Sequence, residues 1–218
     1  MSSGGQSTLS LAAKACILLP TRHLPSPKAV AANAPSMEYP MNESQVIIGL
    51  SNPKSPTNMG AVLRAAGCFN ATAVRYTGTR HDRAAQYSTD TKQVARRIPA
   101  TRVESLLDGL PETLQVICIE LVEGAVALPQ FVHPAQAIYL FGPEDGTLEQ
   151  ALIDRADAVV YIPTQGCLNL AATVNLVLYD RLCKDPTHEQ GDALIRRSRD
   201  TNNNARIRAN SATPATPT

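Results

Sequence analysis

Short apolar runs alternate with helix-like segments along the central part of the chain. Five runs are rich in Val and Ile, are bounded by Gly, Pro or Asn, and predict buried strands at 46–50, 73–76, 116–121, 137–141 and 158–162. After the first run, apolar residues from Met59 to Phe69 recur at helical spacing, with Asn58 as the predicted N-cap. Residues 168–183 predict a packed terminal helix. The alternation predicts a single α/β domain with a mainly parallel sheet and flanking helices.

The two ends of the chain have a different composition. Residues 1–40 are rich in Ala, Ser and Pro, and we expect a disordered leader there. Residues 184–218 have hardly an apolar cluster, and we expect a disordered basic tail. Residues 41–183 are therefore the predicted folded domain. Apolar residues make up 44% of the chain, which excludes a fully disordered protein, and no apolar run is long enough to cross a membrane.

Charge is nearly balanced over the chain but not along it. Lys and Arg number 20 against 19 Asp and Glu, so the net charge of +1 gives no global attraction to nucleic acid. Between residues 75 and 102, however, basic residues clearly outnumber acidic ones, and this window predicts an anionic partner. Its candidate contacts are Arg80, Arg83, Arg96 and Arg97. A merely solvated basic face explains the window equally well.

Cysteine and histidine give no sign of a disulfide framework or a metal site. The 5 cysteines are an odd number without a close pair, which fits a reducing, cytoplasmic location. The 4 histidines lie far apart, so no two of them share one helical face as metal ligands would. We expect no metal.

Polar loops follow three of the predicted strands, at the ends where ligands collect in open α/β sheets. The first, residues 51–58, leads into a helix that carries Arg64; a solvated helix arginine is the plainer interpretation. The second, residues 141–147, is a tight turn with two acids, which the helix dipole alone would also favour. The third, residues 162–170, holds Asn169, for which helix capping is a sufficient explanation. Convergence of all three on one crevice favours a functional site.

Familiar nucleotide and hydrolase motifs are absent. No G-x-G-x-x-G opens a helix, and neither a P-loop nor a G-x-S-x-G elbow occurs. Cys167 has no histidine in the same set of loops, so we interpret it as a small buried thiol rather than a nucleophile.

The three polar segments together resemble the three motifs of the SpoU-type, or TrmH-like, RNA 2'-O-ribose methyltransferases of the SPOUT superfamily. Residues 58–64, with the sequence NMGAVLR, are similar to the first motif. Phe141-Gly142-Pro143-Glu144 is similar to the second, and Ile162-Pro163 with Leu168-Asn169-Leu170 to the third. The resemblance covers residues 46–183, and the order and spacing of the motifs make it specific.

The resemblance implies a C-terminal trefoil knot, a homodimer and methyl transfer from S-adenosylmethionine to a ribose 2'-hydroxyl of tRNA or rRNA. It assigns cofactor binding to Gly142, Ile162, Cys167 and Leu168. The implied catalytic residues are Arg64, Asn58, Glu144 and Asn169. Two departures are visible: Cys167 stands where the family commonly has Ser, and Gly146 follows Glu144 at two positions rather than three.

Two other functions remain open at this point. A knotted protein that binds RNA without turnover would share the fold, but the presence of both Arg64 and Asn169 speaks against it. A nucleotide-binding α/β enzyme of another chemistry would also fit the pattern of elements, and the missing glycine fingerprint is the main objection to it.

Overall fold

A seven-stranded sheet forms the centre of the protein. The computed structural model describes residues 45–80 and 98–207. In the order of the sheet, the strands are β3 (Ala100–Arg102), β2 (Ala73–Tyr76), β1 (Gln45–Leu50), β6 (Gln136–Phe141), β4 (Gln115–Ile119), β7 (Ala158–Tyr161) and β5 (Val126–Ala127). Every neighbouring pair is parallel. The expectation of an α/β fold with a mainly parallel sheet is confirmed.

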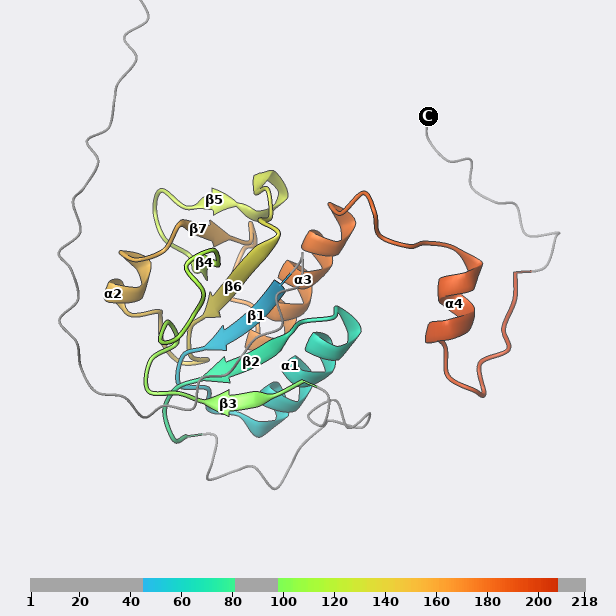
Figure 1. The fold of residues 1–218 in the computed structure, drawn as a ribbon, viewed down its shortest axis with the longest axis horizontal. Helices are drawn as coiled ribbons and strands as arrows, with labels where there is room; N and C mark the ends of the chain where they lie inside the picture. The colour runs from blue at the N-terminus through green and yellow to red at the C-terminus, as the bar shows by residue number, and fades with distance from the viewer. Residues whose placement is uncertain (1–44, 81–97, 208–218) are drawn as a thin grey trace, which may run out of the picture. The chain divides into compact units, whose positions relative to one another are not determined.

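Helices cover the sheet, and the two long ones lie on the same face of it (Figure 1). These are α1 (Pro56–Cys68) and α3 (Leu170–Cys183), which pack against each other and against the sheet in one apolar core. A second core on the other face includes Leu106, Leu148 and the short helix α2 (Gln150–Ile153). Two further short helices are the 3-10 helix η3 (Leu128–Gln130) and α4 (Asp192–Ser198).

The apolar run of β1 explains why that strand lies in the middle of the sheet. Val46, Ile48 and Leu50 belong to the core under α1 and α3, whereas Ile47 belongs to the core on the other face. Both faces are therefore apolar, as in a strand buried on two sides. Gly49 also faces the second core, where an added Cβ would lie 2.5 Å from Leu140 Cδ2.

The elements predicted from the sequence are present, but the start of one helix was wrongly assigned and two strands were missed. All five predicted strands occur, within two residues of the expected bounds, but β3 and β5 were not predicted. The prediction that Asn58 caps α1 is wrong: the helix begins at Pro56, and the Ser55 side chain is the cap, because it accepts the Asn58 backbone N–H at 3.3 Å. Asn169 caps α3 as expected.

The C-terminal segment differs from its prediction. We expected no regular structure in residues 184–218, yet Asp192–Ser198 form α4. The predicted leader, residues 1–40, lies outside the described residues. In the part of the chain that the structure describes, no helix has the length and apolar character to cross a bilayer.

Candidate functional site at the carboxyl ends of β4, β6 and β7

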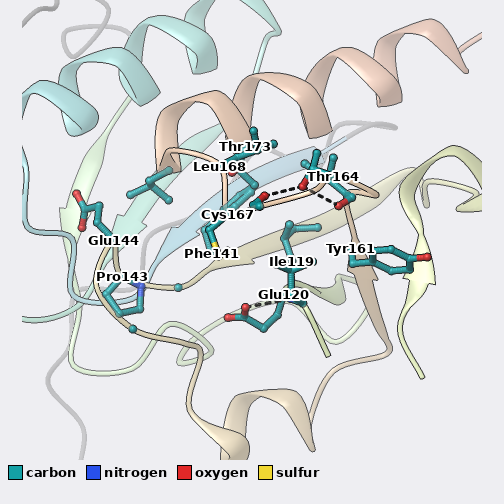
Figure 2. Close-up of a pocket in the computed structure, with 16 residues that line it drawn as sticks. Ile119, Glu120, Phe141, Pro143, Glu144, Tyr161, Thr164, Cys167, Leu168 and Thr173 are labelled. Atoms are coloured by element: carbon teal, nitrogen blue, oxygen red, sulfur yellow. Dashed lines mark hydrogen bonds between the residues drawn. The ribbon is translucent and has the colours of Figure 1, made fainter. Parts of the chain in front are cut away.

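A pocket opens where three adjacent strands end. The segments that follow β4, β6 and β7 form its walls, together with the start of α3 (Figure 2). Because β6, β4 and β7 are neighbours in a parallel sheet, their carboxyl ends meet at one edge. All four residues predicted to bind a cofactor line this pocket: Gly142, Ile162, Cys167 and Leu168.

Gly142 begins the loop that follows β6, where its neighbours lie close to the backbone. A Cβ at this position would lie 3.2 Å from a carboxylate oxygen of Glu120 and 3.2 Å from the Leu148 backbone nitrogen. A side chain here would therefore push the loop away from its neighbours. The missing Cβ lets the two ends of this loop and Glu120 lie close together.

The loop between β7 and α3 also presents backbone to the pocket. The Thr164 hydroxyl donates a hydrogen bond to the Gly166 carbonyl oxygen at 2.7 Å, and this contact folds the loop back on itself (Figure 2). The next residues, Cys167 and Leu168, are exposed and line the pocket. The interpretation of Cys167 as a buried thiol is therefore wrong: its side chain is accessible at the pocket wall.

Three residues predicted to be catalytic form a hydrogen-bonded chain. The Asn169 side-chain nitrogen donates to Asn58 Oδ1 at 3.0 Å, and Asn58 Nδ2 donates to Glu144 Oε1 at 3.0 Å. Asn169 Oδ1 meanwhile accepts the Ala171 N–H at 2.9 Å and so caps α3. One polar residue from each of the three motifs is thus fixed relative to the other two.

Glu144 is held at the entrance of α1 as an acceptor. Its carboxylate accepts the backbone N–H groups of Lys54 at 2.8 Å and Ser55 at 2.9 Å in addition to the Asn58 amide. Burial by itself would raise the pKa of Glu144, but the hydrogen bonds from Asn58, Ser55 and Lys54 outweigh burial and lower the pKa below its ordinary value. Glu144 is therefore ionised at neutral pH.

Of the four predicted catalytic residues, Glu144 lines the pocket, whereas Asn58, Asn169 and Arg64 lie outside its wall. Arg64 also takes no part in the hydrogen-bonded chain of the other three. It is exposed on α1, whereas Val62, Leu63, Ala65 and Ala66 are buried, so it lies off the apolar face as expected. It follows Asn58 by six residues, which corresponds to roughly 9 Å along a helix axis. Arg64 is thus an exposed residue of the helix that carries Asn58.

Of the four arginines predicted to bind RNA, the structure describes Arg80. Its guanidinium forms two hydrogen bonds with the Asp145 carboxylate, at 2.9 Å and 2.8 Å. The Arg80 hydrogen bond is the main cause that lowers the pKa of Asp145, and Lys54, whose Nζ lies 3.4 Å from Asp145, contributes as well. Arg83, Arg96 and Arg97 lie outside the described residues.

The segment after β4 is the part of the site that the sequence analysis missed. Ile119, Glu120 and Leu121 line the pocket beside the two predicted loops. We had extended the strand to Leu121, so Glu120 was assigned to its interior, whereas β4 ends at Ile119. A search of every strand's carboxyl end with shorter strand bounds would have found Glu120.

Metal-ligand geometry is absent from residues 45–80 and 98–207, where no cluster of three or more His, Cys, Asp or Glu side chains could hold an ion.

Comparisons with known proteins agree with the α/β fold. A model of the SpoU rRNA Methylase family matches residues 45–179. The chain therefore belongs to the SpoU rRNA Methylase family. A search of curated protein sequences found no match.

Solved structures share the fold at low sequence identity. The SpoU methyltransferase AviRb from Streptomyces viridochromogenes is 23% identical, with a TM-score of 0.55 over 66% of this chain and 60% of AviRb; AviRb has also been solved in complex with the cofactor AdoMet. An RNA 2'-O ribose methyltransferase is 25% identical, with a TM-score of 0.55 over 67% of this chain and 59% of its own. The A. aeolicus TrmH/SpoU tRNA modifying enzyme is 18% identical, with a TM-score of 0.57 over 65% and 77% of the two chains. The alignment thus spans about 60% of AviRb.

Proposed function

We propose that this protein transfers a methyl group from S-adenosylmethionine to a ribose 2'-hydroxyl of RNA, releasing S-adenosylhomocysteine as the leaving group and the hydroxyl proton to solvent water. The observation that carries the proposal is the hydrogen-bonded chain from Asn169 through Asn58 to Glu144, at the border of a pocket to which Glu144 itself contributes. These are the polar residues of three separate motifs. Family membership supports the same activity.

The chemistry of the pocket fits S-adenosylmethionine. Ile119, Phe141 and Leu170 provide apolar walls for a flat purine, and the backbone around Gly142 and Gly166 provides polar groups without side chains in the way. We propose that Gly142, Ile162, Cys167 and Leu168 hold the cofactor. When bound there, the cofactor would supply an activated methyl group on a sulfonium.

Arg64 is the proposed partner of the reacting RNA. A guanidinium has a pKa above ~12 and keeps its proton, so it suits a phosphate clamp and a stabiliser of the developing negative charge on the 2'-oxygen better than a general base. Asn58, Glu144 and Asn169 would hold α1 and the two loops in fixed positions around the transfer site. Much of the acceleration would then come from orientation of the ribose oxygen.

The RNA class is a finer part of the proposal. Among the related structures, the A. aeolicus protein is described as a tRNA modifying enzyme and the family as rRNA methylases. We propose that the substrate is tRNA or rRNA and that the enzyme acts in the cytoplasm. Arg80 is the proposed contact to one RNA phosphate next to the pocket entrance.

A homodimer and a trefoil knot belong to the same proposal. Leu176 and Tyr179 are 42% and 57% exposed on the outer side of α3, with Ala172, Asn175 and Cys183 beside them on the same helical stripe. A second copy of the chain would cover this stripe. The knot would be formed by the segment around residues 162–170, as the family resemblance implies.

The test combines cofactor binding with identification of the methylated nucleoside. Calorimetry with S-adenosylmethionine should give one site per chain. Nucleoside mass spectrometry of separated tRNA and rRNA, from cells with and without the gene, should show one 2'-O-methylated nucleoside that is lost in one of the two fractions. Binding without any lost nucleoside would favour a non-catalytic RNA-binding protein, and absence of both would contradict the proposal.

A further inference from the structure

Glu120 is a carboxylate of the pocket for which the proposed reaction has no use. It follows β4 directly and lines the pocket between the two cofactor loops (Figure 2). Its Oε1 accepts the backbone N–H of Leu121 at 3.0 Å, and its Oε2 accepts the backbone N–H of Leu148 at 2.9 Å. Each carboxylate oxygen thus receives one backbone donor.

The contacts of Glu120 join three segments of the site. The Glu120 backbone N–H donates to the Val160 carbonyl oxygen of β7 at 3.0 Å, while its side chain reaches the far end of the loop that follows β6. Gly142, at the near end of that loop, lies against the same Oε2 atom, so close that an added Cβ would be 3.2 Å from it. Oε2 therefore contacts both ends of the loop 142–148.

We propose that Glu120 is a positioning residue that fixes the loop 142–148 in its cofactor-binding conformation. The Leu148 N–H holds the loop's end down on the carboxylate, and Gly142 is thereby kept against the pocket wall. The inference rests on the proposed function only as far as the ligand is concerned; the effect on the loop itself does not depend on it.

The chemistry of the side chain makes the role specific for a carboxylate. Glu120 has to accept hydrogen bonds at both of its oxygens, and each donor is a backbone N–H that cannot turn away. Glutamine has the same size but offers one oxygen and one NH₂ group. In Glu120→Gln, one backbone N–H would therefore face another donor, and in Glu120→Ala both would lose their acceptor.

The experiment uses the full-length protein and two independent measurements. Hydrogen exchange of the Leu148 amide reports the loop, and calorimetry with S-adenosylmethionine reports the ligand. The variants are Glu120→Gln and Glu120→Ala. Glu123→Gln is the matched control, because Glu123 is an exposed acid three residues further along, outside the pocket wall.

We expect faster exchange at Leu148 and roughly tenfold weaker cofactor binding in both Glu120 variants, as the loss of a charge-assisted hydrogen bond implies. Exchange in β1 should stay near wild type, which shows that the fold is kept, and Glu123→Gln should change neither measurement. Weaker binding with unchanged exchange at Leu148 would mean that Glu120 contacts the cofactor directly, which overturns the positioning role. Unchanged exchange and unchanged binding would overturn it as well.

A wild-type protein that binds no S-adenosylmethionine would contradict the proposed function. The exchange measurement alone would then decide whether Glu120 positions the loop 142–148. Faster exchange at Leu148 in both variants would then still support Glu120 as the residue that positions the loop. Unaltered exchange at Leu148 would contradict the positioning role of Glu120, whatever the protein binds. The two failures are therefore distinguishable.

Discussion

Asn58 links the three motifs, because both the nitrogen and the oxygen of its side-chain amide form hydrogen bonds to residues of the other two motifs. Its nitrogen donates to Glu144 and its oxygen accepts from Asn169, so the orientation of the amide is fixed by a donor on one side and an acceptor on the other. A carboxylate in its place would set one acid against another at Glu144. An aliphatic residue would leave both partners without their hydrogen bond.

Replacement of Arg64 tests the proposed chemistry at the level of one side chain. We expect Arg64→Ala to lower kcat/KM by at least about 100-fold, since the charge that stabilises the 2'-oxygen would be lost. Arg64→Lys should restore little, because one ammonium lacks the two-pronged geometry of a guanidinium. Methylation assays measure both variants.

Folding and cofactor binding should be nearly intact in these variants, because Arg64 is exposed on α1. Circular dichroism and calorimetry check this. Arg155→Ala, a change at an exposed arginine in the turn after α2, is the control and should behave like wild type. Activity of Arg64→Ala close to wild type would remove Arg64 from the proposed reaction.

Glu144 should make stability depend on pH. Its pKa in the folded protein lies below the ordinary value of 4.5, so the ionised group contributes stability above pH 4.5, and this contribution is lost as the pH falls through the folded pKa. We expect Glu144→Gln to lower the free energy of unfolding by about 1 kcal/mol at pH 7, a figure reduced for the partial exposure of the group. The difference from wild type should shrink below pH 4.5. Urea unfolding at several pH values measures it.

Glu149→Gln changes the same functional group at an exposed site and is the control for this series. It should leave the free energy of unfolding within experimental error of wild type at each pH. A Glu144→Gln difference that stays constant from pH 7 to pH 3 would mean that the ionised carboxylate is not what stabilises the start of α1.

At the scale of elements, the strands that are buried in the core could be predicted from the sequence, whereas the strands that form only by pairing with a neighbour were missed. Apolar runs in the sequence correspond to the five strands β1, β2, β4, β6 and β7. By contrast, β3 has three residues with the burial pattern exposed, intermediate, exposed, and β5 has two residues. Both lie at the edges of the sheet and exist because a neighbouring strand offers free hydrogen-bonding groups. No periodicity in the chain could have shown them.

The start of α1 was predictable from local chemistry that we weighed incorrectly. Ser55 followed by Pro56 is a typical N-cap with proline at the first helical position, whereas we chose Asn58 because it precedes the first apolar residue of the stripe. The motifs pointed to the loops after β6 and β7, which do line the pocket, and the binding of a cofactor there stays a prediction. Glu120 could not follow from motifs, because its role depends on the folded distance to Leu148.

Asn169 combines two element-level tasks that substitution can separate. Asn169→Ala should lower the free energy of unfolding by about 1 kcal/mol, because the N-cap of α3 is lost. Asn169→Asp keeps an oxygen for the Ala171 N–H, so its stability should stay near wild type. It loses the donor to Asn58, however, and we expect reduced methyl transfer. Thermal unfolding and methylation assays of the two variants separate these effects.

A stability of Asn169→Asp as low as that of Asn169→Ala would show that the link to Asn58, and not the cap, stabilises α3. Ser105→Ala is a useful comparison, because the Ser105 hydroxyl also accepts a backbone N–H, that of Leu107 at 3.3 Å, and Ser105 lies outside the pocket wall and the α3 stripe. We expect that variant to keep its methyl-transfer activity.

At the scale of the whole molecule, the exposed stripe of α3 predicts a dimer. Leu176→Asp and Tyr179→Asp would each place a charge in an apolar interface without touching the buried side of the helix. We expect both variants to sediment as monomers at concentrations where the wild type is a dimer. Ile195→Asp is the control, because Ile195 is equally exposed at 57% but lies on α4. A monomeric wild type, or dimeric variants, would contradict the α3 interface.

RNA binding by the basic window, residues 75–102, also concerns the whole molecule. In this window, an RNA phosphate and Asp145 compete for Arg80. Arg80 and Lys54 both face Asp145, so an RNA phosphate that binds Arg80 has to displace a carboxylate of this chain. Arg80→Ala should therefore reduce the slope of log affinity against log salt by roughly 0.7 to 0.9, the value for one phosphate contact. Asp145→Asn should do the opposite and strengthen RNA binding at low salt, because Arg80 is released. Filter binding over a salt series measures both, with the exposed Asp200→Asn as the control. If Arg80→Ala left the slope unchanged, the Arg80–Asp145 pair would be a structural link between the β2 exit and the loop after β6, and RNA binding would have to rest on other basic residues of the chain.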